Sequence, residues 1–328
     1  MLQGRDERVV VEYPLALAPM AGVSDRPFRQ LCHEQGAGLV FNEMVSSKPG
    51  LRDTRKSELR RIHPDDPEPR AVQLLGNDPA ELARAARQAY ADGARIIDIN
   101  LGCPAKKVCR KAAGSALMAD PDTVARLLEA TVNAVPCPVT LKMRTGPDAD
   151  RRNAPEIAAI AEDAGIAMLS IHGRTREQKY RGEAEYDTIG RVVAERGIPV
   201  LANGDIDSVD RAREVLAATG AAGLMIGRAA FGRPWLFARL RAGLEGRPVP
   251  REPGPAAIMA FARTQFENIY SHYGNVMGVR IARKHWECYS SLLPFEEGMR
   301  KQFNRLETID SQRRWLDERE AELADATT

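Results

Sequence analysis

Short apolar segments alternate with longer amphipathic segments from Leu15 to about Leu244. The apolar segments lie at 15–20, 38–44, 70–75, 96–101, 139–144, 167–172, 199–203 and 223–227, and they are nearly continuous in Val, Ile, Leu, Ala and Met. Such runs are typical of strands buried on both faces of a parallel sheet. The segments between them, such as 79–91, 121–134, 154–164 and 209–219, carry apolar residues at helical spacing. The pattern therefore predicts alternating strands and helices.

Local signals at the ends of the amphipathic segments support this prediction. Asp78 and Asp120 each stand directly before a proline, and Ser208 precedes the segment 209–219. A capping side chain followed by proline is a common helix start. Gly165 and Gly220 follow two of the segments, where helices often end.

The number and length of the units predict the fold. Eight strand–helix units over about 230 residues match a (β/α)8 TIM barrel, a fold of the α/β class. An open doubly wound sheet is the competing fold, but it requires a Gly-x-Gly-x-x-Gly turn after the first strand. The sequence there is Ala18-Pro19-Met20-Ala21-Gly22, which does not match.

The alternation of apolar and amphipathic segments ends after Leu244. Prolines at 248, 250, 253 and 255 form a break suited to a linker between domains. The remaining residues show only helical periodicity, for example at Ile258, Phe261, Ala262 and Phe266. We therefore expect a barrel domain over 1–244 and a small all-α bundle of three or four helices over 245–328.

Composition excludes several classes of protein. The 328 residues are 44% hydrophobic and 28% charged, as in ordinary globular proteins. No apolar run approaches the roughly 18 residues needed to cross a membrane, and the first 13 residues lack the apolar core of a signal peptide. We expect a cytoplasmic protein. The five cysteines are odd in number and form no C-x-x-C pair, which argues against disulfide frameworks and zinc ribbons.

The ends of the parallel strands of a barrel meet at one rim, where barrel enzymes keep their active sites. Lys142 lies inside the apolar fifth strand, where an unpartnered charge would be costly. It can be a Schiff-base amine, a fixed charge beside an electron-rich ring, or half of a structural ion pair. Other residues at the strand ends are Pro19, Met20, Ala21, Gln73, Asn100, Cys103, Arg144, His172, Arg174, Asn203, Gly204, Asp205, Gly227 and Arg228.

Cys103 is the most informative of these residues. A free cysteine is usually a small buried hydrophobe, but Cys103 follows a strand directly, in a Gly-Cys-Pro turn. A thiol with a pKa of about 8.5 is protonated at neutral pH and can act as a general acid. The basic loop that follows, with Lys106 and Lys107, suggests an anionic substrate, although a charged run is more often a solvated loop.

Glycine-containing turns end the seventh and eighth strands. Such turns lead into helix N-termini and can cradle a phosphate with backbone N–H groups. Arg228 would add a charge that grips the phosphate. Ordinary turn chemistry is the alternative interpretation. No metal is required by any of these groups.

Six spaced motifs resemble the dihydrouridine synthase family, the flavin enzymes that reduce uridine in transfer RNA. They are the runs 17–25, 100–104, 141–144, 172–176, 203–205 and 227–228. The resemblance continues through 283–285 and 303–305 in the helical tail, and the run 105–108 is most similar to the bacterial B subfamily.

The resemblance implies a bound FMN, NADPH as its reductant and a tRNA substrate. Flavin contacts would come from Pro19, Met20, Ala21, Gln73, Lys142, His172, Asn203, Gly204, Asp205, Gly227 and Arg228. Substrate contacts would come from Asn100, Arg174, Lys106, Lys107, Arg283, Lys284 and Arg305. Reduction of uracil would place a hydride from FMN on C6 and a proton from Cys103 on C5.

Other functions stay open at this point. A flavin barrel acting on a free pyrimidine-like molecule would retain FMN but have no use for a basic helical tail. An RNA-binding module with an idle barrel would not need Cys103, and an aldolase would use Lys142 as a Schiff base. We expect a monomer that does not bind membranes. The tRNA position and the preference for NADPH over NADH do not follow from the sequence.

Overall fold

The computed structural model describes residues 1–48, 59, 61–295 and 297–325. The chain divides into two compact units, Met1–Ala229 and Ala230–Thr328. The helix α9 (Leu236–Leu244), which the sequence assigns to the barrel domain, falls in the second unit.

The first unit is built on a parallel sheet of nine strands within the described residues, in the order β4-β3-β11-β10-β9-β8-β7-β6-β5. The strands are β3 (Leu15–Leu17), β4 (Leu39–Val40), β5 (Val45–Ser46), β6 (Ala71–Leu75), β7 (Ile96–Leu101), β8 (Val139–Arg144), β9 (Met168–His172), β10 (Val200–Asn203) and β11 (Gly223–Ile226). The predicted α/β barrel is confirmed.

One strand differs from the prediction. Within the predicted strand 38–44 only β4, Leu39–Val40, forms, and a second short strand, β5, begins just beyond its end at Val45; β4 and β5 lie at opposite ends of the strand order. Val40 pairs with Leu17 of β3, whereas Phe41 forms a parallel bridge with Ala71 of β6. This segment therefore lies between β3 and β6, and it closes the sheet into a ring.

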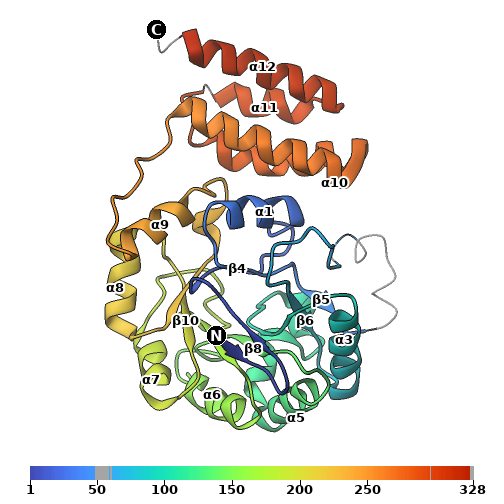
Figure 1. Cartoon of the computed structure of the whole chain (residues 1–328), viewed down its shortest axis with the longest axis vertical. Helices are drawn as coiled ribbons and strands as arrows, with labels where there is room; N and C mark the ends of the chain where they lie inside the picture. Colours follow the sequence, from blue (N-terminus) through green and yellow to red (C-terminus); the bar gives the residue numbers. More distant parts are fainter. Residues whose placement is uncertain (49–58, 60, 296, 326–328) are drawn as a thin grey trace. The chain divides into compact units, whose positions relative to one another are not determined.

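The helices of this unit lie around the outside of the strands (Figure 1). They include α1 (Arg26–Glu34), α3 (Pro79–Ala91), α5 (Pro121–Val132), α6 (Ala154–Asp163), α7 (Asp187–Glu195) and α8 (Val209–Thr219). The predicted caps are present: Asp78, Asp120 and Ser208 accept hydrogen bonds from backbone N–H groups of their helices. Gly220 ends α8 with a φ of 64°, a left-handed conformation that favours glycine.

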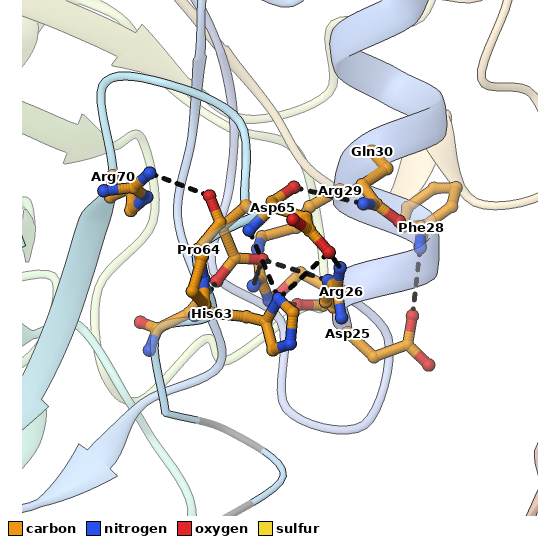
Figure 2. Close-up of polar contacts among 12 residues, drawn as sticks. Asp25, Arg26, Phe28, Arg29, Gln30, His63, Pro64, Asp65 and Arg70 are labelled. Atoms are coloured by element: carbon orange, nitrogen blue, oxygen red, sulfur yellow. Dashed lines mark hydrogen bonds and ion pairs between the residues drawn. The ribbon is translucent and has the colours of Figure 1, made fainter. Parts of the chain in front are cut away.

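The first helix is tied to the segment that precedes β6. Asp25 caps α1 by accepting from the N–H of Phe28, and Arg26 pairs with Asp65 at 2.8 Å (Figure 2). The buried Arg29 pairs with Asp66 at 2.7 Å. The two ion pairs join residues 39 and 37 positions apart in the sequence, so they hold the segment before β6 against α1.

The second unit is helical over its described residues. It contains α9, α10 (Pro255–Ser290), α11 (Glu297–Arg305) and α12 (Ile309–Asp325). Its core is aromatic, with Phe266, Trp286, Phe303 and Trp315 packed together. The long α10 is broken at Gly274, whose φ of 70° and ψ of −172° are not helical. In the part of the chain that is described, no helix is long and apolar enough to span a membrane.

Candidate active site

The strand ends β6 to β10 bring a group of buried polar side chains together. Asn100 on β7 is in register with Lys142 on β8. Arg144 on β8 is in register with His172 on β9, which in turn is in register with Asn203 on β10. Residues that are hydrogen-bonded neighbours in a parallel sheet lie at one level. The register therefore brings these side chains to one end of the barrel.

Lys142 is an amine inside this group, with 9% of its surface exposed. Its Nζ donates to Oδ1 of Asn203 at 3.3 Å. Burial, reinforced by the charge of Arg144, lowers the pKa of Lys142 to about 8, and the carboxylate of Asp98 acts in the opposite direction. The amine remains charged at neutral pH and sits where a ligand with negative charge would be stabilised.

A chain of hydrogen bonds joins the floor of the site to the Cys103 turn. Asp98, fully buried, accepts from Nε2 of Gln73 at 2.7 Å and from Oγ1 of Thr140 at 2.6 Å. Nδ2 of Asn100 donates to Oε1 of Gln73 at 2.7 Å. Oδ1 of Asn100 accepts the N–H groups of Gly102 and Cys103 at 3.1 and 2.9 Å. The side-chain amides of Gln73 and Asn100 are therefore already hydrogen-bonded within the protein, and each has one N–H left for a ligand.

Cys103 is partly buried, and its surroundings keep it in the thiol form. Burial is the main reason that the pKa of Cys103 is raised, with a further contribution from Cys109. The loop folds back over it: Ser115 donates its N–H and its hydroxyl to the Cys103 carbonyl at 3.1 and 2.8 Å. Gly114 is required there, because its φ is 61° and a Cβ would lie 2.9 Å from the Cys103 carbonyl oxygen. The thiol is suited to donate a proton.

The turns after β10 and β11 differ in the space at their glycines: Gly204 after β10 is crowded, with a Cβ there only 2.7 Å from the Ala184 Cβ, whereas Gly227 after β11 is open. A Cβ on Gly227 would meet nothing closer than Ala18 at 3.8 Å and Met20 at 3.9 Å. Gly204, with a φ of 127°, lies so close to His172 that a Cβ would be 3.1 Å from its ring. Open space above backbone groups at a strand end is suited to a phosphate or a flat ring.

The carboxylate of Asp205 is already paired with two arginines. Both of its carboxylate oxygens accept from Arg174, at 2.9 and 2.6 Å, and it also pairs with Arg228 at 3.2 Å. Arg174 is buried and donates further to the carbonyls of Arg181 and Gly182. The structure therefore gives Arg174 a visible role in holding Asp205 and the loop 181–182, and its predicted contact with substrate stays a prediction.

His172 is a neutral imidazole. Burial, together with the charges of Lys142, Arg144, Arg174 and Arg228, moves its pKa well below the usual range. It can hydrogen-bond to a ligand without adding a charge.

Tyr180 is a candidate that the sequence analysis missed. Its side chain is 55% exposed, and it lies 5.5 Å from the guanidinium of Arg144 and 5.1 Å from that of Arg228. The ring of His172 is 6.3 Å away. Arg144 donates to the carbonyls of Gly102 and Lys179, so it ties the Cys103 turn to the Tyr180 loop. An aromatic residue flanked by Lys179 and Arg181 was the signal available in the sequence.

The turn 19–22 is held by a second residue that the site prediction did not include. Pro19 and Met20 are partly buried, and Ala21 is exposed. The buried Glu43 accepts a hydrogen bond from the N–H of Gly22. This contact orients the turn that follows β3.

The basic residues predicted to meet RNA lie in both units. Lys106 and Lys107 are exposed in α4 (Lys106–Cys109), and Lys284 and Arg305 are exposed in the helical unit. Arg283 is partly buried, donates to the Leu306 carbonyl and lines a cavity of about 510 Å³ between α10 and α12. Across the described ranges, no cluster of three or more His, Cys, Asp or Glu side chains is placed to hold a metal ion.

Comparison with known proteins shows the family of this chain. The family model described as "Dihydrouridine synthase (Dus)" matches residues 16–327. The tRNA-dihydrouridine synthase B of Pseudomonas aeruginosa is 54% identical over 299 residues, which cover 91% of this chain and 90% of the relative. The protein of the same name from Xanthomonas axonopodis is 52% identical over 296 residues, covering 90% and 89%. That from Salmonella typhimurium is 50% identical over 299 residues, covering 91% and 93%. This chain belongs to the dihydrouridine synthase family.

Proposed function

We propose that this protein reduces specific uridines of tRNA to 5,6-dihydrouridine, with FMN as its flavin and NADPH as the reductant. The observation that carries the proposal is the buried ammonium of Lys142 at the rim that also holds the Cys103 thiol, in a chain that is 54% identical to a tRNA-dihydrouridine synthase B. The barrel would be the catalytic domain and the helical unit a tRNA-binding domain.

The residues at the rim fit a flavin. The charge of Lys142 is only partly offset by buried Asp98, so an electron-rich ring that becomes anionic on reduction would complete the site. Gln73 keeps one amide hydrogen for the edge of a heterocycle. Open space at Gly227, next to Arg228, suits the phosphate, with the turn 19–21, His172, Asn203, Gly204 and Asp205 around the remainder.

When bound, FMN would supply the hydride that uracil receives at C6. Cys103 would give the proton to C5, because burial keeps its thiol protonated at neutral pH. Lys142 would hold negative charge at the flavin edge, and neutral His172 would hydrogen-bond without competing for that charge. Asn100 would meet the uracil with its remaining N–H.

The target base must leave the folded tRNA to reach this rim, since enzymes that act on a base take it out of the stack. Tyr180 is 55% exposed, so its ring is placed to stack on a nucleotide, and the guanidinium groups of Arg144 and Arg228 lie within 5.5 Å of the ring centroid. Backbone phosphates would be contacted by Lys106, Lys107, Arg283, Lys284 and Arg305. Such contacts make binding fall as salt rises.

The test uses purified protein, FMN, NADPH or NADH, and tRNA made in vitro without modified bases. Mass spectrometry of nuclease fragments should show a gain of two hydrogens at one or a few uridines. Free uridine is the matched alternative substrate. Reduction of free uridine and not of tRNA would replace the proposal by a small-molecule reductase, and reduction of neither would refute it. We propose further that the protein acts in the cytoplasm and as a monomer. Light scattering, which measures the molar mass in solution, tests the oligomeric state.

A further inference from the structure

Asp98 is a buried carboxylate that the proposed reaction does not use directly. It lies on β7, two residues before Asn100, and is fully buried. Both side chains that donate to it, Gln73 and Thr140, are neutral. A buried charge is costly unless it is well hydrogen-bonded. A buried carboxylate beside the candidate site is therefore a candidate for a functional role.

The carboxylate sets a direction for the hydrogen bonds that follow. An ionised carboxylate only accepts, so Gln73 must turn its NH2 group toward Asp98. The carbonyl of Gln73 then faces Nδ2 of Asn100 at 2.7 Å. This leaves Oδ1 of Asn100 to accept the N–H of Gly102 and that of Cys103. Reversing any amide in the chain would bring oxygen against oxygen or N–H against N–H.

We propose that Asp98 is a positioning residue, whose carboxylate orients Gln73 and Asn100 and through them holds the backbone of the Cys103 turn. This inference deepens the proposed function, because it matters for catalysis only if Cys103 is the proton donor. The orientation itself is independent of any substrate. Arg144, which donates to the Gly102 carbonyl at 2.7 Å, supports the turn from its other side but does not set the amide direction.

Protonation of Asp98 would weaken this anchor, because a neutral carboxyl accepts hydrogen bonds less strongly than a carboxylate, while the N–H groups of Gly102 and Cys103 still fix the direction of the Asn100 amide. The strand β6 presents Gln73 to Asp98, and β8 presents Thr140 and the charge of Lys142. Burial raises the pKa of Asp98 to about 6, with Thr140, Gln73 and Lys142 acting in the opposite direction. The pKa of Lys142 is about 8, that of Cys103 is raised and that of His172 is lowered well below 6.5. A transition near pH 6 at this turn therefore reports Asp98.

The experiment follows the Cys103 amide by NMR in protein labelled with 15N-cysteine. The chain has five cysteines, so the spectrum has few signals, and Cys103→Ser identifies the one of interest. We expect this signal to shift with pH with a midpoint near 6 in the wild-type protein. In Asp98→Asn it should stay at the low-pH position at every pH, because asparagine, like a protonated carboxyl, is neutral and accepts hydrogen bonds less strongly than a carboxylate. Its amide hydrogen exchange at pH 8 should be about tenfold faster than in the wild type.

Thr140→Val is the matched control variant. It leaves Asp98 ionisable but removes a hydrogen bond that lowers its pKa, so the midpoint should move to higher pH. The signals of buried Cys32 and Cys137 show in each variant whether the fold is intact. If Asp98→Asn fails to fold, the midpoints of the wild type and Thr140→Val still decide the matter.

Kinetics separate this inference from the proposed function. With tRNA as substrate, Asp98→Asn should lower kcat about tenfold and leave KM within twofold. An NMR titration as expected, in a protein that does not reduce tRNA, would refute the proposed function alone. A Cys103 signal without a midpoint near pH 6, or one that is unchanged in Asp98→Asn, would overturn the positioning role.

Discussion

Lys142 makes the stability of the protein depend on pH with a sign and size that can be worked out. Burial is the largest cause that lowers its pKa from the ordinary 10.5 to about 8. Each pKa unit corresponds to about 1.4 kcal/mol, so a charged Lys142 costs the folded state about 3 kcal/mol below pH 8. Between pH 8 and 10.5 the unfolded chain binds more protons than the folded one, and stability rises with pH. Above 10.5 both forms are neutral, and the cost is gone.

Lys142→Met tests this arithmetic. Methionine keeps an unbranched side chain in the same space but carries no charge. It also loses the 3.3 Å hydrogen bond to Asn203, which is worth about 1 kcal/mol. The variant should be about 2 kcal/mol more stable than the wild type at pH 7 and about 1 kcal/mol less stable at pH 10.5. The free energy of unfolding is measured on flavin-free protein by urea titration, with circular dichroism as the signal.

The control is Lys106→Met, which removes an exposed lysine from the same rim. Surface substitutions usually change stability by less than about 0.5 kcal/mol, so this variant should match the wild type at both pH values. A Lys142→Met protein that is less stable than the wild type at pH 7 would refute the reasoning. So would a difference that keeps the same sign and size up to pH 10.5. The first result would mean that nearby groups compensate the charge of the buried amine, and the second that protonation of Lys142 does not cause the difference.

Three further outcomes are expected. Cys103→Ala should bind FMN and accept electrons from NADPH but reduce tRNA at least about a hundredfold more slowly, measured by dihydrouridine formation; loss of flavin would instead show a structural role for the thiol. Tyr180→Ala should raise the KM for tRNA roughly tenfold through lost stacking, whereas Tyr180→Phe should not, and flavin fluorescence should be equal in both. Arg174→Ala should destabilise the protein by about 2 kcal/mol in urea titrations, because Asp205 loses a bidentate partner; an unchanged midpoint would show that Arg228 suffices.

Much of the fold follows from local sequence. The strands and helix starts depend on apolar periodicity and on capping residues such as Asp78, Asp120 and Ser208, which act within a few positions. The convergence of Asn100, Lys142, His172 and Asn203 also follows, because parallel strands of one barrel end at the same rim. Strand spacing alone was enough to indicate that these side chains would meet at one rim.

Other features were decided by contacts between distant parts of the chain. The ring closes where Phe41 meets Ala71, a pairing that no local pattern encodes. Arg174 is held by Asp205, 31 positions later, and Asp98 is held by Gln73 and Thr140, 25 and 42 positions away. Tyr180 lies at the rim, where arginines from two other strand ends are close to its ring. Sequence periodicity determines which face of a strand is buried, but only packing determines which buried polar groups meet, since hydrogen bonding depends on distance in space and not along the chain.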